Sequence, residues 1–170
     1  MNNNEGFTLI FVLMILVTLS IIGFYSIQDS VTEGNISRNI SIYNMNLYAA
    51  DTSGRRLSQV MEDDTSPGIN LKSNVAGHAA YLYNLFDFST APDWAGGLLT
   101  SYYFDSSGTI QACSSSVVTD HQFLAEYNGV APGSNLDVTE PTRLYSYTIY
   151  SRGISGNSSV VTEMNYWRRF

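Results

Sequence analysis

Residues 6–28 read GFTLIFVLMILVTLSIIGFYSIQ, and this stretch decides how the N-terminal part of the chain folds. It contains no charged side chain, and residues 7–25 are almost continuously apolar. A helix of about 19 residues extends roughly 28 Å, enough to cross a hydrocarbon core of about 30 Å. A cleaved secretory signal has an apolar region of only about 7–15 residues, a basic start and a small-x-small cleavage site. Because this stretch lacks those features, we expect a retained membrane anchor.

The start of the stretch, GFTLI at residues 6–10, resembles the processing site of type IV pilins and type II secretion pseudopilins. In that family a prepilin peptidase cuts after the glycine and methylates the new N-terminal amine. The resemblance implies a leader peptide at residues 1–6, a cut between Gly6 and Phe7, and N-methylation of Phe7. It also implies that the apolar helix packs against other filament subunits, beginning with Thr8, Leu9, Ile10 and Phe11. The leader carries Glu5 and lacks the Lys or Arg that is usual in the family.

A helical pattern continues beyond the anchor. Gly34 and Gly54 each weaken a helix by about 1 kcal/mol relative to alanine, so a kink or short interruption is plausible there. The sequence EDDTSPG at residues 62–68 predicts the end of the helix. We therefore expect a transmembrane helix at residues 7–27 and an amphipathic helix at residues 28–63 that continues into a head. Apolar residues at intervals of three and four place one stripe on this helix: Ile36, Ile40, Tyr43, Leu47 and Ala50.

Residues 44–51, NMNLYAAD, supply a second and partial resemblance. PilX-like minor pilins carry an aromatic-x-Ala-Glu-Ala type stretch at this distance from the anchor. Here Asp51 stands where Glu is usual. The alternative is an ordinary amphipathic helix that uses alanine where it packs closely.

The remaining residues, 64–170, are expected to form a mostly β globular head, because the composition from residue 69 onward shifts to Tyr, Ser, Thr, Gly and Asn. A strand is expected at residues 98–104, a turn at 105–108 and a returning strand at 109–113. Near the C-terminus, residues 143–152 and 159–167 predict a hairpin around turn residues 153–158. In the first of these strands, Tyr145, Tyr147 and Ile149 share one face.

The end of the chain, with Arg168 and Arg169, also resembles the C-terminus of PilX-like proteins. They tend to finish with a strand, a small-residue turn and a strand ending in consecutive arginines. The two arginines are expected either as solvated charges at a strand end or as partners of an acidic neighbouring subunit.

Composition excludes some classes of partner. Of the 170 residues, 14% are charged, below the roughly 25% of average soluble proteins. The net charge of −7 disfavours nucleic acid and anionic lipid headgroups as partners, because both bind basic surfaces. Cys113 is the only cysteine, so it is either a small buried apolar residue or a thiol that pairs with another molecule.

No motif points to catalysis or to a bound metal. His78 and His121 are not spaced as metal ligands, and no nucleophile motif such as Gly-x-Ser-x-Gly occurs. The oxygen-rich sequences at residues 105–108 and 128–129 suit calcium superficially, but turn formation explains both. We therefore expect neither enzymatic activity nor a cofactor or metal.

These observations predict an α+β protein: a long N-terminal helix, transmembrane in its first half, packed on a small antiparallel β-sheet head. The resemblance implies a PilX-type minor pilin that helps to initiate type IV pilus assembly. Its partners would be prepilin peptidase, other minor pilins, the major pilin and a PilY-type tip adhesin, with no nucleic acid. It would cross the bacterial inner membrane once, with a periplasmic head, before reaching the cell-surface pilus. Two alternatives stay open: a capping minor pseudopilin of a type II secretion system, and a membrane-anchored periplasmic binding protein or enzyme.

The residue at position 11 bears on where in the filament such a pilin would lie. In most of the family the fifth residue after the cut is Glu, whose carboxylate is thought to neutralise the amine of the subunit above. A lone carboxylate in lipid costs about 2.5–3.5 kcal/mol, so it is retained only where a partner amine exists. A subunit at the tip has nothing above it, and Phe11 stands at this position. Together with the resemblance, Phe11 implies a minor pilin at or near the tip.

Overall fold

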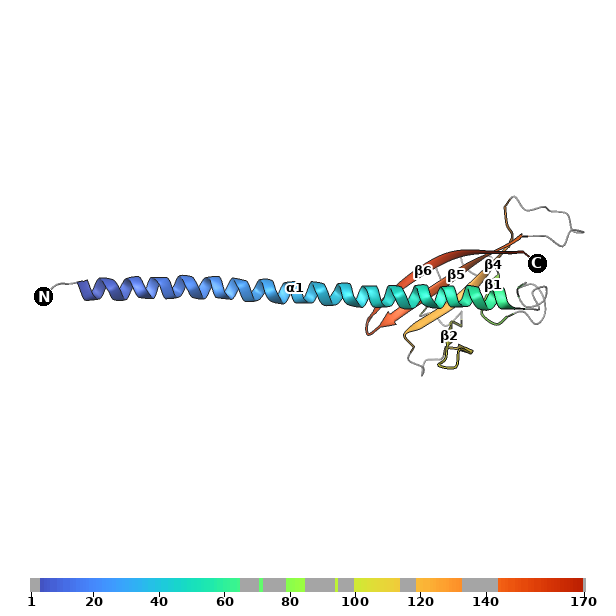
Figure 1. Cartoon of the computed structure of the whole chain (residues 1–170), viewed down its shortest axis with the longest axis horizontal. Helices are drawn as coiled ribbons and strands as arrows, with labels where there is room; N and C mark the ends of the chain where they lie inside the picture. Colours follow the sequence, from blue (N-terminus) through green and yellow to red (C-terminus); the bar gives the residue numbers. More distant parts are fainter. Residues whose placement is uncertain are drawn as a thin grey trace, which may run out of the picture. The chain divides into compact units, whose positions relative to one another are not determined.

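The structure, a computed structural model, describes residues 4–64, 71, 79–84, 94, 100–113, 119–132 and 144–169. The chain divides into two compact units, Met1–Ser41 and Ile42–Phe170. The helix α1, Asn4–Asp63, contributes to both (Figure 1). The helix ends at Asp63, inside the predicted stop sequence at residues 62–68. It continues through Gly34 and Gly54, so the interruption considered at these glycines is absent.

The second unit contains a six-stranded sheet in the order β3-β2-β4-β5-β6, with β1 also paired to β4. Together with the long helix, this sheet confirms the predicted α+β architecture with a predominantly antiparallel head. The exception is β1, which runs parallel to β4 through the pair Leu82–Ala125. The pair Tyr102–Phe123 joins β2 to β4, so β1 and β2 both pair with β4. The strands are β1 Leu82–Asn84, β2 Tyr102–Phe104, β3 Ile110–Ala112, β4 His121–Val130, β5 Leu144–Ser155 and β6 Ser158–Arg169.

The predicted C-terminal hairpin is confirmed as β5 and β6, which pair without a register shift from Leu144–Arg169 to Ser155–Ser158. Its turn is shorter than expected. Only Gly156 and Asn157 connect the strands, and Gly156 has the positive φ of 57° that a tight hairpin turn requires. Gly153, expected in the turn, instead lies inside β5.

Two other boundaries differ from the expectation. The predicted turn at residues 105–108 is present between β2 and β3, but β2 begins only at Tyr102, and residues 95–99 lie outside the described part of the chain. Asn128 and Gly129 do not form a turn. They lie within β4, where the pairing with β5 shifts register between Tyr127 and Gly129 and Gly129 has a φ of 88°. This is a β-bulge, which glycine accommodates because it lacks a Cβ.

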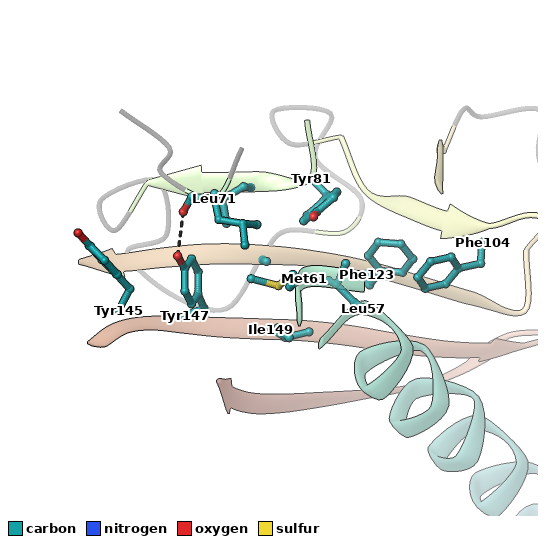
Figure 2. Packing of buried hydrophobic residues seen from close by; sticks show 11 residues of the cluster. Leu57, Met61, Leu71, Tyr81, Phe104, Phe123, Tyr145, Tyr147 and Ile149 are labelled. Atoms are coloured by element: carbon teal, nitrogen blue, oxygen red, sulfur yellow. Dashed lines mark hydrogen bonds between the residues drawn. The ribbon is translucent and has the colours of Figure 1, made fainter. Parts of the chain in front are cut away.

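The core of the head lies between the C-terminal part of α1 and the sheet. Figure 2 shows Leu57 and Met61 of the helix close to Phe123 and Ile149. As predicted, Tyr145, Tyr147 and Ile149 are buried together. Full burial of one such side chain contributes about 1.5–3 kcal/mol, so this cluster supplies much of the stability of the head.

The helix face that packs on the sheet is displaced from the predicted apolar stripe. Tyr43 is exposed and Leu47 only half-buried, whereas Ala50, the last member of the stripe, is fully buried. In the first unit, Ile36 and Ile40 are exposed as well. The buried positions of the helix recur at intervals of three and four and include two polar residues: Asn46, Ala50, Ser53, Leu57 and Met61.

The end of α1 is fastened to the end of the hairpin. Arg168 donates from Nη2 to the carbonyl oxygen of Asp64 at 3.0 Å, and its Nε lies 3.9 Å from Glu62 Oε2. Tyr166 also donates its hydroxyl to Glu62. A cation that binds the last carbonyls of a helix also interacts favourably with the helix dipole. Arg168 therefore packs within its own subunit, and of the two arginines only Arg169 is exposed at the strand end.

Candidate functional site

The most unusual surface in the first unit is the apolar segment Phe7–Tyr25 of α1. Its large apolar side chains are between 43% (Ile15) and 73% (Phe7) exposed. Within the described residues, one helix is long and apolar enough to cross a membrane, and its most apolar window has no buried residue. Scattered exposed apolar residues are ordinary, but an unbroken surface of this length marks contact with a membrane or with other proteins.

The polar residues of this segment are compatible with an apolar surrounding. Thr18 donates its hydroxyl to the carbonyl oxygen of Ile15 at 2.8 Å, and Ser20 donates to that of Leu16 at 2.8 Å. A hydroxyl in lipid needs such a partner, because there is no water to supply one. Since residues 6–28 also carry no charge, the segment can be immersed in lipid without an unpaired polar side chain at Thr18 or Ser20.

The predicted processing site lies at the start of this helix. Because α1 begins at Asn4, the bond between Gly6 and Phe7 is in its first turn, and the side chain of Phe7 is 73% exposed. The first four N–H groups of a helix have no intrahelical acceptor, so this turn can be unwound at little cost. A peptidase could therefore extend the backbone around Gly6 and reach the bond.

The predicted packing residues follow directly on the same helix. Leu9, Ile10 and Phe11 are 70%, 66% and 55% exposed. Thr8 and Leu9 also line a shallow depression with three further side chains on one side of the helix: Val12, Leu13 and Leu16. Ridges and depressions of this kind are the surfaces through which helices pack against one another. The predicted residues thus lie within the exposed apolar part of the helix, where Leu9, Ile10 and Phe11 present large apolar side chains that could pack on another helix.

In the second unit, a depression of about 330 Å³ lies between α1 and the strands β2 and β4. Its polar groups include Arg56, Asp120 and His121. The guanidinium carbon of Arg56 lies 4.5 Å from the centre of the Phe104 ring, a cation–π contact that attaches β2 to the helix. Asp120 and His121 are adjacent in sequence and lie at the start of β4.

The histidine in this depression is fully engaged. His121 Nδ1 lies 2.6 Å from Asp120 Oδ1, and Nε2 accepts the backbone N–H of Phe104 at 3.2 Å. Because Nε2 accepts this hydrogen bond, the donor on the ring is Nδ1, which faces the Asp120 carboxylate. Neither ring nitrogen is therefore free to act as a base or a metal ligand. The bond from the Phe104 N–H to His121 Nε2 adds a contact between β2 and β4 beside their short strand pairing. Among the described residues, no three His, Cys, Asp or Glu side chains gather as they would around a metal ion; His78 lies outside those residues.

The turn between β2 and β3 also uses its oxygen atoms internally. Asp105 Oδ1 accepts from the backbone N–H of Ser107 at 2.9 Å and from that of Thr109 at 2.8 Å. Hydrogen bonds from the Ser107 hydroxyl and from Thr109 hold the pKa of the Asp105 carboxyl below its ordinary value. This arrangement is that of an Asx turn, so turn formation accounts for the acidic residue.

Cys113 follows β3 and is half-buried. Burial raises the pKa of its thiol above the ordinary value. A raised pKa keeps the sulfur in its less reactive thiol form. This favours the interpretation of Cys113 as a small, partly buried apolar residue.

Comparison with known proteins adds no relative. No family model, curated protein or solved structure matches the chain. Fold and surface define the class only coarsely: an α+β protein with one N-terminal helix that can span a membrane. Sequence reasoning located the exposed helix but missed the contacts of Arg56 and His121 with Phe104, because residues this far apart leave no local pattern.

Proposed function

We propose that this chain is a minor pilin that helps to initiate type IV pilus assembly and occupies the tip or a position near it. One observation carries the proposal: the GFTLI motif at residues 6–10 begins the exposed, uncharged apolar part of a long helix, and the C-terminal part of this helix packs on a small β-sheet head. A generic membrane anchor explains the apolar helix, but it does not require Gly-Phe at its start.

The mechanism is helix bundling. In the inner membrane, the segment Phe7–Tyr25 contacts lipid. During assembly it exchanges lipid for the corresponding helices of other minor pilins and of the major pilin. Apolar helices gain little hydrophobic free energy from this exchange, so the association relies on close packing between shaped surfaces. The exposed side chains of Leu9, Ile10 and Phe11 provide such a surface at the N-terminal end.

The tip assignment rests on Phe11. A filament subunit with Glu at this position can pair with the amine of the subunit above, whereas Phe11 offers no charge. A subunit that lacks the carboxylate suits the first position, above which no subunit is added. The head, periplasmic before assembly and displayed on the pilus afterwards, would then be available to a PilY-type adhesin.

Mass spectrometry of the mature chain tests the proposal. The full-length chain is expressed in cells with an active prepilin peptidase and in cells without it. We expect an N-terminal peptide that begins at methylated Phe7 only in the first case. An N-terminus at Met1 in both strains, or a cut at any other bond, would refute the proposal.

A second measurement separates the minor pilin from the capping pseudopilin. The tagged chain is isolated from cells that contain both sets of candidate partners. Recovery of type IV minor pilins supports the proposal, whereas recovery of secretion-system pseudopilins alone supports the alternative. Correct processing without either set of partners would favour a separate anchored protein.

A further inference from the structure

We infer that the outer edge of β6 binds an extended peptide segment of a partner protein by strand addition. β6 is the last strand in the sheet order, and within the described part of the chain its outer edge pairs with no strand. It runs over 12 residues, Ser158–Arg169, beside β5 (Figure 1). This inference does not depend on pilus assembly, because it rests only on the second unit.

The register of the sheet identifies the backbone groups on this edge. The N–H of Ile154 donates to Asp120 and the carbonyl of Leu144 accepts from Ala131, so these even-numbered residues of β5 direct their groups towards β4. Their odd-numbered neighbours therefore bond to β6, beginning with the pair Ser155–Ser158 beside the turn. In β6 the even-numbered residues therefore direct their N–H and C=O groups towards β5. The outward N–H and C=O groups belong to Ser159, Val161, Glu163, Asn165, Trp167 and Arg169.

β6 lacks most of the devices that protect an edge strand from pairing. Natural edges are commonly short, bulged, interrupted by proline or protected by charged side chains, above all lysine. Of these devices β6 has only charged residues, Glu163, Arg168 and Arg169. β6 contains neither proline nor lysine and pairs with β5 without a bulge along its whole length. It also exposes two apolar side chains, Val161 at 44% and Trp167 at 60%. A long, regular edge with exposed apolar residues is a surface for strand addition.

The side chains on the exposed face define the chemistry of the occupant. Val161, Glu163, Asn165, Trp167 and Arg169 alternate along one face of β6 and are all exposed. Opposite charges and apolar pairs stabilise facing residues on neighbouring strands. An antiparallel segment therefore fits when it reads acidic-x-apolar-x-polar-x-basic-x-apolar. Its acidic residue would face Arg169 and its basic residue Glu163.

A second copy of this chain fits the edge less well. An antiparallel pair of β6 strands centred on Met164 would bring Val161 opposite Trp167, which is favourable. However, the same register places Glu163 opposite Asn165 and Arg169 opposite Ser159, so neither charge faces an opposite charge. A segment of another protein can supply both opposite charges together with the apolar pairs, so it is the better occupant.

Titration of the full-length chain in detergent micelles with a synthetic peptide tests the inference. The probe is Glu-Thr-Val-Thr-Thr-Thr-Lys-Thr-Val, which carries the derived pattern. We expect slower hydrogen exchange at the outward amides of Val161, Glu163 and Asn165. Glu163→Lys should weaken binding about tenfold, because a facing attraction becomes a repulsion. A peptide with Glu in place of its Lys should restore binding to Glu163→Lys, and this rescue also shows that the variant is folded.

A matched pair of variants tests the backbone contact. Asn165→Pro removes an outward N–H without removing a backbone hydrogen bond to β5, and it should abolish peptide binding. Both this variant and its control lose the hydrogen bond that Asn165 Oδ1 accepts from the Thr148 hydroxyl at 3.3 Å, so the comparison isolates the N–H. Asn165→Thr retains the N–H and should bind as the natural chain does. Unchanged exchange at the outward amides, or equal binding of both peptides to Glu163→Lys, would overturn the inference. Protection of these amides in a dimer without peptide would overturn it in favour of a second copy.

Discussion

Gly153 of β5 lies directly against the backbone of Asn46 in α1, so that a Cβ at Gly153 would overlap the Asn46 carbonyl oxygen and lie 2.7 Å from its carbonyl carbon. The helix and the sheet therefore touch backbone to backbone at this point. Burial of Asn46 to 1% exposure and its bond from Nδ2 to Ser158 Oγ at 3.3 Å accompany the contact. Only glycine permits this approach, and its place in the strand is determined by the helix above it.

The first prediction is that Gly153→Ala destabilises the head by about 3 kcal/mol or more, because backbone atoms must move to admit the methyl group. Chemical denaturation of the full-length chain in detergent, followed by near-ultraviolet circular dichroism, measures this loss. Gly34→Ala is the control, because nothing lies within 4 Å of a Cβ there. It should leave the transition unchanged or slightly raised. Equal stability of Gly153→Ala and the natural chain would contradict the proposed contact.

The second prediction concerns the neighbouring contact of Gly54 with Ser151. A Cβ at Gly54 would lie 2.7 Å from the Ser151 hydroxyl oxygen and 3.7 Å from its Cβ. Gly54→Ala alone should therefore cost about 1–2 kcal/mol, since a side chain rather than the backbone must yield. Combined with Ser151→Ala, which removes the oxygen, the cost should be smaller than the sum of the single changes. A double-mutant cycle measures the coupling, and strict additivity would argue against the contact.

These glycines show what local sequence patterns can and cannot predict. The alternation of Tyr145, Tyr147 and Ile149 predicted β5 and its buried face, because a half-buried strand repeats every second residue. The prediction that Gly153 belongs to the turn was wrong. Glycine is common in turns, but Gly153 is needed because α1, more than 100 residues away in sequence, lies against it. The same close approach explains why small and polar residues such as Asn46 lie on the buried helix face, where hydropathy alone predicted a different stripe.

The candidate sites divide in the same way. The exposed segment Phe7–Tyr25 could be predicted, because its apolar run is continuous in sequence. The interactions around Phe104 could not, since they join α1, β2 and β4. The parallel strand β1 was also missed, because its three residues are too few to show a period.

The third prediction tests the role of His121. Because Nε2 accepts the backbone N–H of Phe104, His121→Ala should leave this N–H without its acceptor and loosen β2 from β4. Hydrogen exchange at the Phe104 amide should accelerate about fivefold or more, a change of about 1 kcal/mol. Val161→Ala, a change at an exposed residue of β6, is the control and should have little effect there. If the exchange rate of the Phe104 amide is unchanged in His121→Ala, His121 is not the acceptor that protects this amide.

The fourth prediction concerns alkaline pH. Burial raises the pKa of Tyr81 from 10.0 to about 12, and burial likewise raises the pKa of Tyr147, whose hydroxyl donates to the Leu71 carbonyl at 2.9 Å (Figure 2). The folded chain thus favours the neutral phenols. This stabilisation is complete below pH 10 and is lost as pH rises through the folded pKa values. Stability should fall by about 2 kcal/mol through Tyr81 alone between pH 10 and 12. Tyr81→Phe should reduce the fall, whereas Tyr48→Phe, at an exposed position, should not.

The last prediction addresses the tip assignment. Phe11 is 55% exposed on the apolar helix, so Phe11→Glu should not disturb the head, and its insertion cost of about 2.5–3.5 kcal/mol is small enough for the helix to remain in the membrane. We expect processing after Gly6 to be intact by mass spectrometry. We also expect a shift in placement, seen by immunogold labelling as loss of strict tip localisation, because the new carboxylate can pair with the amine of a subunit added above. Phe11→Leu, which stays apolar, is the matched control and should label the tip only. If Phe11→Glu and Phe11→Leu initiate the same number of pili and label the same positions, the absence of a carboxylate does not determine where this subunit sits.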